Sequence, residues 1–107
     1  MLNLSEINKT SYNIIGVMSG TSLDGLDICL CNFTKDNNKW RYKIHKAITI
    51  NYANSIRDRL ASAFSATGIE ITKLDYDYGR WIGVQIKEFL EGATITPDFM
   101  ASHGHTI

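Results

Sequence analysis

One short stretch of this sequence concentrates groups that can bind phosphate and a metal ion. Residues 16–27, GVMSGTSLDGLD, place glycines, hydroxyl side chains and two aspartates directly after a short apolar run. Backbone N–H groups in such a turn form an anion site, and the hydroxyls of Thr21 and Ser22 can donate to phosphate oxygens. Asp24 and Asp27 would repel a bare phosphate but fit one that carries hydrated Mg²⁺. The residues therefore favour a metal–nucleotide site over a site for a free anion, and an ordinary hairpin turn stays equally open.

Two common phosphate loops do not fit these residues. The P-loop requires Lys after its second glycine, but Leu26 follows Gly25 here. A dinucleotide loop requires G-x-G-x-x-G at the start of a helix, whereas these glycines precede a predicted strand. A phosphate loop between two antiparallel strands is the type that actin-like and sugar-kinase ATPases use.

The elements that must position this loop are strands of an α/β fold. Apolar runs and alternation predict strands over residues 13–18, 26–33, 40–50 and 97–102. A turn at 34–39 closes a hairpin, and Trp40, Tyr42 and Ile44 share one face of the third strand. The last strand is expected to join the sheet parallel to the first.

Two helices are predicted between the third and fourth strands. The first covers residues 55–64, with Asn54 or Ser55 as its N-cap. Its apolar face consists of Ile56, Leu60, Ala63 and Phe64. The second begins near Thr72, which forms a capping box with Asp75, and ends at Gly92. Its Gly79 and Gly83 are expected to allow close packing of another element. Its apolar face consists of Leu74, Tyr78, Trp81, Ile82, Val84 or Gln85, Ile86, Phe89 and Leu90.

The predicted order β-β-β-α-α-β describes half of a layered α/β domain. Because no helix follows the last strand, the sequence is interpreted as truncated. The 107 residues form part of one domain, with 1–12 as a flexible tail. Lys plus Arg equals Asp plus Glu at 11 each, which argues against nucleic acid or an anionic membrane as the main partner. No apolar run approaches the ~20 residues that span a bilayer, and no secretory signal opens the chain, so a cytoplasmic location is expected.

The two cysteines, Cys29 and Cys31, lie two apart in a predicted strand. That spacing places both side chains on one face, in poor geometry for bonding each other. An isolated C-x-C is a weak metal signal. We therefore interpret both as small buried thiols in a reducing compartment.

The loop and the end of the chain together resemble a known family. GVMSGTSLDGLD is similar to G-x-M-S-G-T-S-x-D-G-x-D, the opening motif of the anhydro-N-acetylmuramic acid kinases. SHGHTI, at 102–107, resembles that family's second motif, S-H-G-Q-T-[VI], with His105 in place of the usual Gln. The resemblance runs from Ile14 onward and implies the N-terminal portion of a ribonuclease-H-like, actin-like ATPase domain.

The family resemblance implies a function and a set of site residues. ATP and Mg²⁺ would be the cofactors, and the phosphate loop would be formed by Gly20, Thr21, Ser22, Leu23, Asp24, Gly25, Leu26 and Asp27. Ser102, His103 and Gly104 would face the sugar. The enzyme would open 1,6-anhydro-N-acetylmuramic acid with water and phosphorylate O6, giving N-acetylmuramic acid 6-phosphate in cell-wall recycling. Its general base and adenosine site are expected beyond Ile107, so residues 1–107 alone are expected to be inactive. The full-length protein could be a homodimer.

Other interpretations remain beside this one. The chain could be a non-catalytic actin-like nucleotide-binding module, or an inactive small domain whose loop is only a hairpin. His103 is either a sugar contact or a structural histidine, and His105 is expected to be solvated or disordered. Tyr78 and Trp81 are expected to pack in the core, and His45 to lie on an exposed face.

Overall fold

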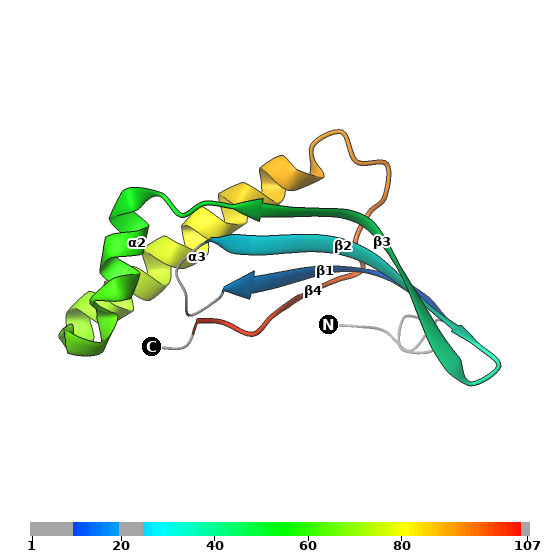
Figure 1. Cartoon of the computed structure of the whole chain (residues 1–107), viewed down its shortest axis with the longest axis horizontal. Helices are drawn as coiled ribbons and strands as arrows, with labels where there is room; N and C mark the ends of the chain where they lie inside the picture. Colours follow the sequence, from blue (N-terminus) through cyan, green and yellow to red (C-terminus); the bar gives the residue numbers. More distant parts are fainter. Residues whose placement is uncertain (1–9, 20–24, 106–107) are drawn as a thin grey trace.

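A computed structural model describes residues 10–19 and 25–105 of the chain, which form a sheet and two helices (Figure 1). The elements are β1 (Ser11–Ser19), β2 (Leu26–Asp36), β3 (Lys39–Ile50), α2 (Asn54–Ala61), the short 3₁₀ helix η1 (Ala63–Ser65), α3 (Gly68–Leu90) and β4 (Phe99–Ser102). The predicted α/β class and the order β-β-β-α-α-β are confirmed. Ser11 and Tyr12, predicted to belong to a tail, already pair with β2.

The described strands form one mixed sheet in the order β3-β2-β1-β4. β1 pairs antiparallel with β2, and β2 pairs antiparallel with β3. β4 lies parallel to β1, as predicted, with Ile14 opposite Phe99 and Val17 opposite Ser102. Just before β4, Asp98 N donates to Asn13 O at 2.6 Å, and Asn13 N donates to Asp98 Oδ2 at 2.8 Å. The carboxyl ends of β1 and β4 therefore meet at one edge of the sheet.

The core lies between one face of this sheet and the two helices. Alternate residues of β1 and β2 point into it, and each helix contributes an apolar face. The buried side chains are Ile15, Val17, Leu26, Ile28, Leu30, Tyr52, Ile56, Leu60, Ala63, Leu74, Tyr78 and Phe89. Figure 1 shows α2 and α3 together beside the end of the sheet where the β1 and β3 arrowheads lie.

The helices begin at residues other than those predicted. α2 follows Ala53, which offers no side-chain cap, so the assignment of Asn54 or Ser55 as the cap is wrong. α3 begins at Gly68, one turn before Thr72, because the capping box is formed by Thr67 and Glu70. Thr67 Oγ1 accepts from Glu70 N at 3.2 Å and donates to Glu70 Oε1 at 2.9 Å. The predicted end of α3 is confirmed, since the helix ends at Leu90 and Gly92 has φ 76°.

Other details of the helices also differ from prediction or decide between alternatives. Of the two candidates for the apolar face of α3, Val84 is exposed and Gln85 is half-buried. Phe64 is 81% exposed, because α2 ends at Ala61 and the 3₁₀ geometry of η1 turns this ring away from the core. At Gly79 and Gly83, a Cβ would meet no heavy atom of another element within 4 Å. Within the part of the chain described, no element approaches them closely, so the predicted packing role is not found.

The cysteines contact each other on β2. Their Sγ atoms lie 2.9 Å apart, and both residues are free and half-buried. A register shift between Leu30 and Cys31 interrupts the regular pairing of β2 with β3 at this point. Burial, followed by the hydrogen bond and the charge of Cys29, raises the pKa of Cys31 to about 11. The thiols are therefore closer together and less buried than the strand spacing predicts.

Candidate functional site

The candidate site is the sheet edge where β1 and β4 end. Ser19 ends β1, Gly25 precedes β2, and residues 103–105 follow β4. Ligands of open α/β sheets bind beyond the carboxyl ends of parallel strands, and β1 and β4 are the parallel pair here. In Figure 1 the arrowhead of β1 and the end of the red strand lie at the same edge. Parallel pairing thus brings the two motifs of the sequence together.

A buried polar cluster ties this edge together. Ser19 is only 5% exposed, and its Oγ lies 2.5 Å from Tyr52 OH and 2.6 Å from His105 Nδ1. Tyr78 OH donates to Ser19 Oγ at 2.6 Å, and the two tyrosine hydroxyls are 3.0 Å apart. Four segments that are distant in sequence therefore converge on one serine: the end of β1, the β3–α2 connection, α3 and the residues after β4.

Aromatic packing positions the two tyrosines. The Tyr52 and Tyr78 rings meet edge to face at 5.9 Å, and Trp81 stacks on Tyr78 at 6.3 Å. His105 meets Tyr78 edge-on, with ring centroids 6.2 Å apart. Burial raises the pKa of Tyr78, which keeps its phenol protonated and able to donate. The predicted core placement is confirmed for Tyr78, which is buried, and Trp81 packs against the core.

His105 differs from its prediction. The sequence predicts a solvated or disordered side chain, but His105 is half-buried and bonded to Ser19. Burial, and secondarily the charge of His103, lower the pKa of His105 below its ordinary value of 6.5. The ring is therefore neutral near neutral pH. The prediction of a solvated side chain is wrong because β4 pairs parallel to β1, which places His105 next to the buried end of β1.

Part of the proposed phosphate loop can be placed. Gly20, Thr21, Ser22, Leu23 and Asp24 lie outside the described residues. Gly25 is buried, and a Cβ there would collide with the Ile50 carbonyl oxygen. The structure thus requires glycine at 25 for the close approach of two backbones. The Leu26 side chain is fully buried in the core, which leaves its backbone for any ligand contact. Asp27 is exposed and accepts a hydrogen bond from Thr49 Oγ1 at 2.5 Å.

The second group of predicted site residues is accessible. Ser102, His103 and Gly104 are all exposed. Gly104 adopts φ 73°, and its N–H donates to Ser102 Oγ at 3.2 Å. The turn is thus stabilised by its own serine. A cavity of about 340 Å³ next to it is lined by Gly16, Val17, Met18, Ala101, Ser102 and His103.

The fit of the site to Mg²⁺ and phosphate rests on few described groups. Mg²⁺ keeps most of its waters and needs only one or two carboxylates. Asp27 offers one carboxylate at this edge, with its second oxygen available beside the Thr49 bond. In residues 10–19 and 25–105, no group of three or more His, Cys, Asp or Glu could hold a metal ion. Among the described residues, the donors at this edge therefore amount to one carboxylate, which fits the small number of protein ligands that hydrated Mg²⁺ needs.

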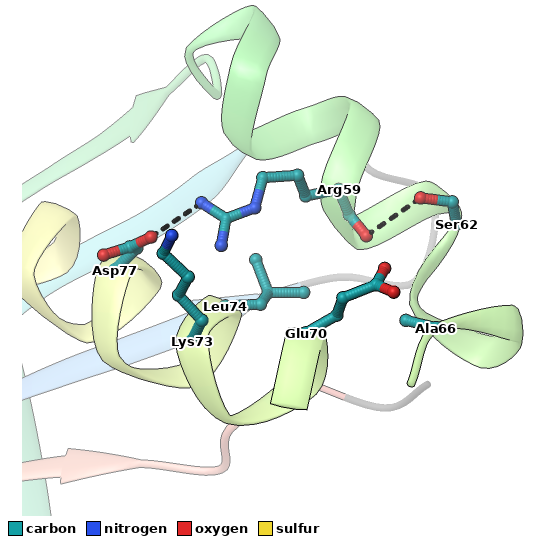
Figure 2. Close-up of a pocket in the computed structure, with 7 residues that line it drawn as sticks. All are labelled: Arg59, Ser62, Ala66, Glu70, Lys73, Leu74 and Asp77. Carbon is teal, nitrogen blue, oxygen red and sulfur yellow. Dashed lines mark hydrogen bonds and ion pairs between the residues drawn. The ribbon is translucent and has the colours of Figure 1, made fainter. Parts of the chain in front are cut away.

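Another cavity lies away from this edge, between α2 and α3. It has about 400 Å³ and is lined by Arg59, Ser62, Ala66, Glu70, Lys73, Leu74 and Asp77. Figure 2 shows Arg59 reaching from α2 toward Asp77 on α3, and the two form an ion pair of 2.8 Å. Two cations and two carboxylates line the same hollow, so it favours neither anions nor cations. It also contains no residue of either motif.

Sequence reasoning missed Ser19 and Tyr52 as members of the site. A signal for Ser19 existed: it follows Ile15 and Val17 at a spacing of two, so the alternation that buries them also buries Ser19. A serine at a core position needs a buried partner. Nothing local in the sequence identifies that partner as Tyr52, Tyr78 or His105.

The fold and the site together define an α/β protein in which β1 and β4, the strands next to the two motifs, end at one edge of a mixed sheet. Comparison with known proteins identifies the family. The sequence model described as anhydro-N-acetylmuramic acid kinase matches residues 12–107. The chain belongs to the anhydro-N-acetylmuramic acid kinase family, and the resemblance of its two motifs is confirmed.

Individual relatives support the same assignment. The chain is 33% identical over 105 residues to the anhydro-N-acetylmuramic acid kinase of Pseudoalteromonas translucida (strain TAC 125), and 32% identical over 106 residues to that of Pseudoalteromonas atlantica (strain T6c / ATCC BAA-1087). Each alignment covers 92% of this chain and 26% of the relative. A Bacillus thuringiensis subsp. konkukian kinase is 30% identical over 100 residues. The chain thus spans about a quarter of the length of these relatives. Among the described helices, none is long and apolar enough to cross a membrane.

Proposed function

We propose that this chain contributes the nucleotide-phosphate loop and part of the sugar site of a cytoplasmic kinase that acts on 1,6-anhydro-N-acetylmuramic acid. The product would be N-acetylmuramic acid 6-phosphate, formed during cell-wall recycling. The observation that carries the proposal is the meeting of both motifs at one sheet edge, where Ser19 and His105 are hydrogen-bonded at 2.6 Å. A phosphate donor and its acceptor must be held side by side, and this edge joins the two segments that would bind them.

The proposed roles follow the chemistry of each side chain. Residues 20–27 would surround the ATP phosphates with backbone N–H groups and with the hydroxyls of Thr21 and Ser22. Asp24 and Asp27 would hold the waters of Mg²⁺. Bound Mg²⁺ would offset the negative charge of the transferring phosphoryl group. Ser102, His103 and Gly104, at the end of β4 and just after it, are exposed and would contact the sugar.

The proposed reaction breaks two bonds between heavy atoms and forms two, and it transfers one proton. Water oxygen bonds to the anomeric carbon while the bond from that carbon to O6 breaks. O6 then bonds to the γ-phosphorus of ATP, whose bond to the β–γ bridging oxygen breaks, and ADP leaves. The proton lost by water goes to a general base, which we place outside residues 1–107. This chain would therefore bind and align the reactants without supplying the base.

A chimera tests the proposal. Residues 12–107 would replace the matching segment of the Pseudoalteromonas translucida kinase, and ADP release and sugar phosphate would be measured with anhydro sugar and ATP. We expect turnover, and a loss of about 10²-fold in kcat with Asp24→Asn, comparable to removing one transition-state donor. Asp36→Asn, at the far hairpin, is the matched control and should keep full activity.

Two outcomes would reject this function. If Asp24→Asn left kcat of an active chimera unchanged, the loop would not serve the phosphates. Tight nucleotide binding with no turnover of any sugar would favour the non-catalytic module instead.

A further inference from the structure

Four short contacts join the hydroxyls of Ser19, Tyr52 and Tyr78 to one another and to His105. The three hydroxyls, which we call the hydroxyl triangle, contact one another pairwise at 2.5, 2.6 and 3.0 Å. The fourth contact joins Ser19 Oγ to His105 Nδ1 at 2.6 Å. Polar atoms at these distances repel through their lone pairs unless a hydrogen lies between them. Each hydroxyl donates only one hydrogen, so the available protons can be counted.

This count of protons allows one arrangement of donors and acceptors. Tyr78 donates to Ser19, so the Tyr52–Tyr78 contact must use the Tyr52 proton. The Ser19–Tyr52 contact must then use the Ser19 proton. All three hydroxyl protons are used within the triangle, and Ser19 retains one free lone pair. The contact between Ser19 and His105 therefore requires a hydrogen on His105 Nδ1.

The other ring nitrogen is then an acceptor. Burial and the nearby His103 favour the neutral form of His105. A neutral imidazole with hydrogen on Nδ1 carries a bare lone pair on Nε2. Across residues 10–19 and 25–105, no group donates to that nitrogen. His105 lines a cavity of about 220 Å³ whose walls are mainly apolar, with Leu60, Ile71, Leu74 and Ile82 among them.

We propose that His105 is a ligand-binding residue whose Nε2 accepts a hydrogen bond from a hydroxyl or N–H group of a ligand in this cavity. The hydroxyl triangle fixes the tautomer that makes Nε2 an acceptor. A neutral group that can donate, as on a sugar, is favoured there. A phosphate oxygen brings its own lone pairs and is repelled. The inference rests on the proton count and does not depend on the proposed kinase function.

Nitrogen-15 NMR of the histidine rings in the 107-residue chain tests the tautomer, at a pH of about 7.5, above the ordinary histidine pKa. His105→Gln assigns the signals among the three histidines, and the exposed His45 and His103 are internal references. We expect the ¹⁵N chemical shift of His105 Nδ1 in the range of protonated ring nitrogens and that of Nε2 in the range of unprotonated ones. Shifts that show a protonated Nε2, or an average of the two tautomers like the shifts of the reference histidines, would overturn the proposal.

Two additives test the polarity of the acceptor. N-acetylglucosamine supplies hydroxyl and N–H donors, and inorganic sulfate, which carries no proton at this pH, supplies only acceptor oxygens. We expect the Nε2 resonance to move with the sugar and to stay in place with sulfate, each at millimolar concentration. A shift with sulfate alone, or with neither additive, would contradict a donor-selective site.

Two variants separate hydrogen bonding from packing. Gln at position 105 keeps one N–H group for Ser19 and one acceptor oxygen, whereas Leu keeps only the volume. His105→Gln should leave the melting temperature nearly unchanged, and His105→Leu should lower it by about 4 °C or more. Equal melting temperatures for the two variants would show that His105 does not donate to Ser19.

Discussion

The two ends of this sheet are stabilised in different ways. At the motif edge, Ser19 is 5% exposed and is held by side chains from three other segments. At the opposite end, the β2–β3 hairpin runs past the helices, and Trp40 and Tyr42 are 53% and 71% exposed (Figure 1). Cross-strand ring pairs, such as Phe33–Tyr42 at 6.3 Å, and exposed or half-buried hydrogen bonds to β1, such as Asn32 Nδ2 to Ser11 Oγ at 3.0 Å, accompany its ladder. One end depends on hydrogen bonds between buried side chains that are distant in sequence, and the other depends on the pairing of neighbouring strands.

The largest expected effect comes from removing the centre of the polar cluster. Ser19→Val deletes the partner of Tyr52, Tyr78 and His105 while keeping similar volume. Because buried polar groups left without partners are costly, we expect the free energy of unfolding to fall by about 1–3 kcal/mol. Urea denaturation measures the loss.

An exposed serine provides the control for that experiment. Ser55 lies on the first turn of α2 and is exposed. Ser55→Ala should change stability by no more than about 0.5 kcal/mol. A Ser19→Val loss as small as this would mean that the cluster contributes nothing beyond packing.

A second large effect concerns a glycine at the same edge. Gly25→Ala places a Cβ against the Ile50 carbonyl oxygen, so one of the two backbones must shift. We expect a destabilisation of about 1–3 kcal/mol, as for other overpacked sites, measured by thermal unfolding.

Gly79→Ala is the matched glycine control. Position 79 lies in α3, has open space where a Cβ would stand, and should gain about 1 kcal/mol from helix propensity. The two substitutions should therefore differ in sign. A loss at Gly79 would show that another surface covers this part of α3.

The contrast between the ends also explains what the sequence could predict. The hairpin is encoded locally: Asn37 and Asn38 both adopt positive φ, of 49° and 64°, as a two-residue turn between antiparallel strands requires. The predicted strands, their order and the parallel β4 follow from equally local patterns and from general topology rules. The start of α3 was missed because Thr67 and Glu70 form a capping box one turn before the predicted one.

The polar cluster could not be predicted in the same way. Its members are separated by 33, 59 and 86 residues from Ser19, so their meeting depends on the assembled sheet and helix packing. The motifs predict which segments carry the site, and this stays a prediction. They did not show that the side chain of His105 turns back onto the end of β1.

A smaller effect is expected from pH. Because the pKa of His105 is lowered in the folded chain, the unfolded chain binds a proton first as the pH falls. The stability due to the neutral ring is fully present above about pH 6.5 and is lost as the pH falls through the folded-state value. His103, Asp75, Tyr78 and Tyr52 are the titratable groups around the ring.

Denaturant midpoints measured across this pH range would check the effect. His105→Gln should flatten the decline in stability, because Gln does not titrate. A decline of the same size in the variant would assign it to groups other than His105.

The smallest effect is expected at the hairpin. Tyr42→Ala removes one cross-strand ring contact from a strand segment that is exposed on both faces, and should cost about 0.2–1 kcal/mol. Thermal unfolding together with light scattering would check both stability and association. If this variant lost as much stability as Ser19→Val, or if it changed the molecular mass in solution, the hairpin would be buried in an assembly of chains. The difference between the two ends would then reflect a missing partner surface and not two modes of stabilisation within one chain.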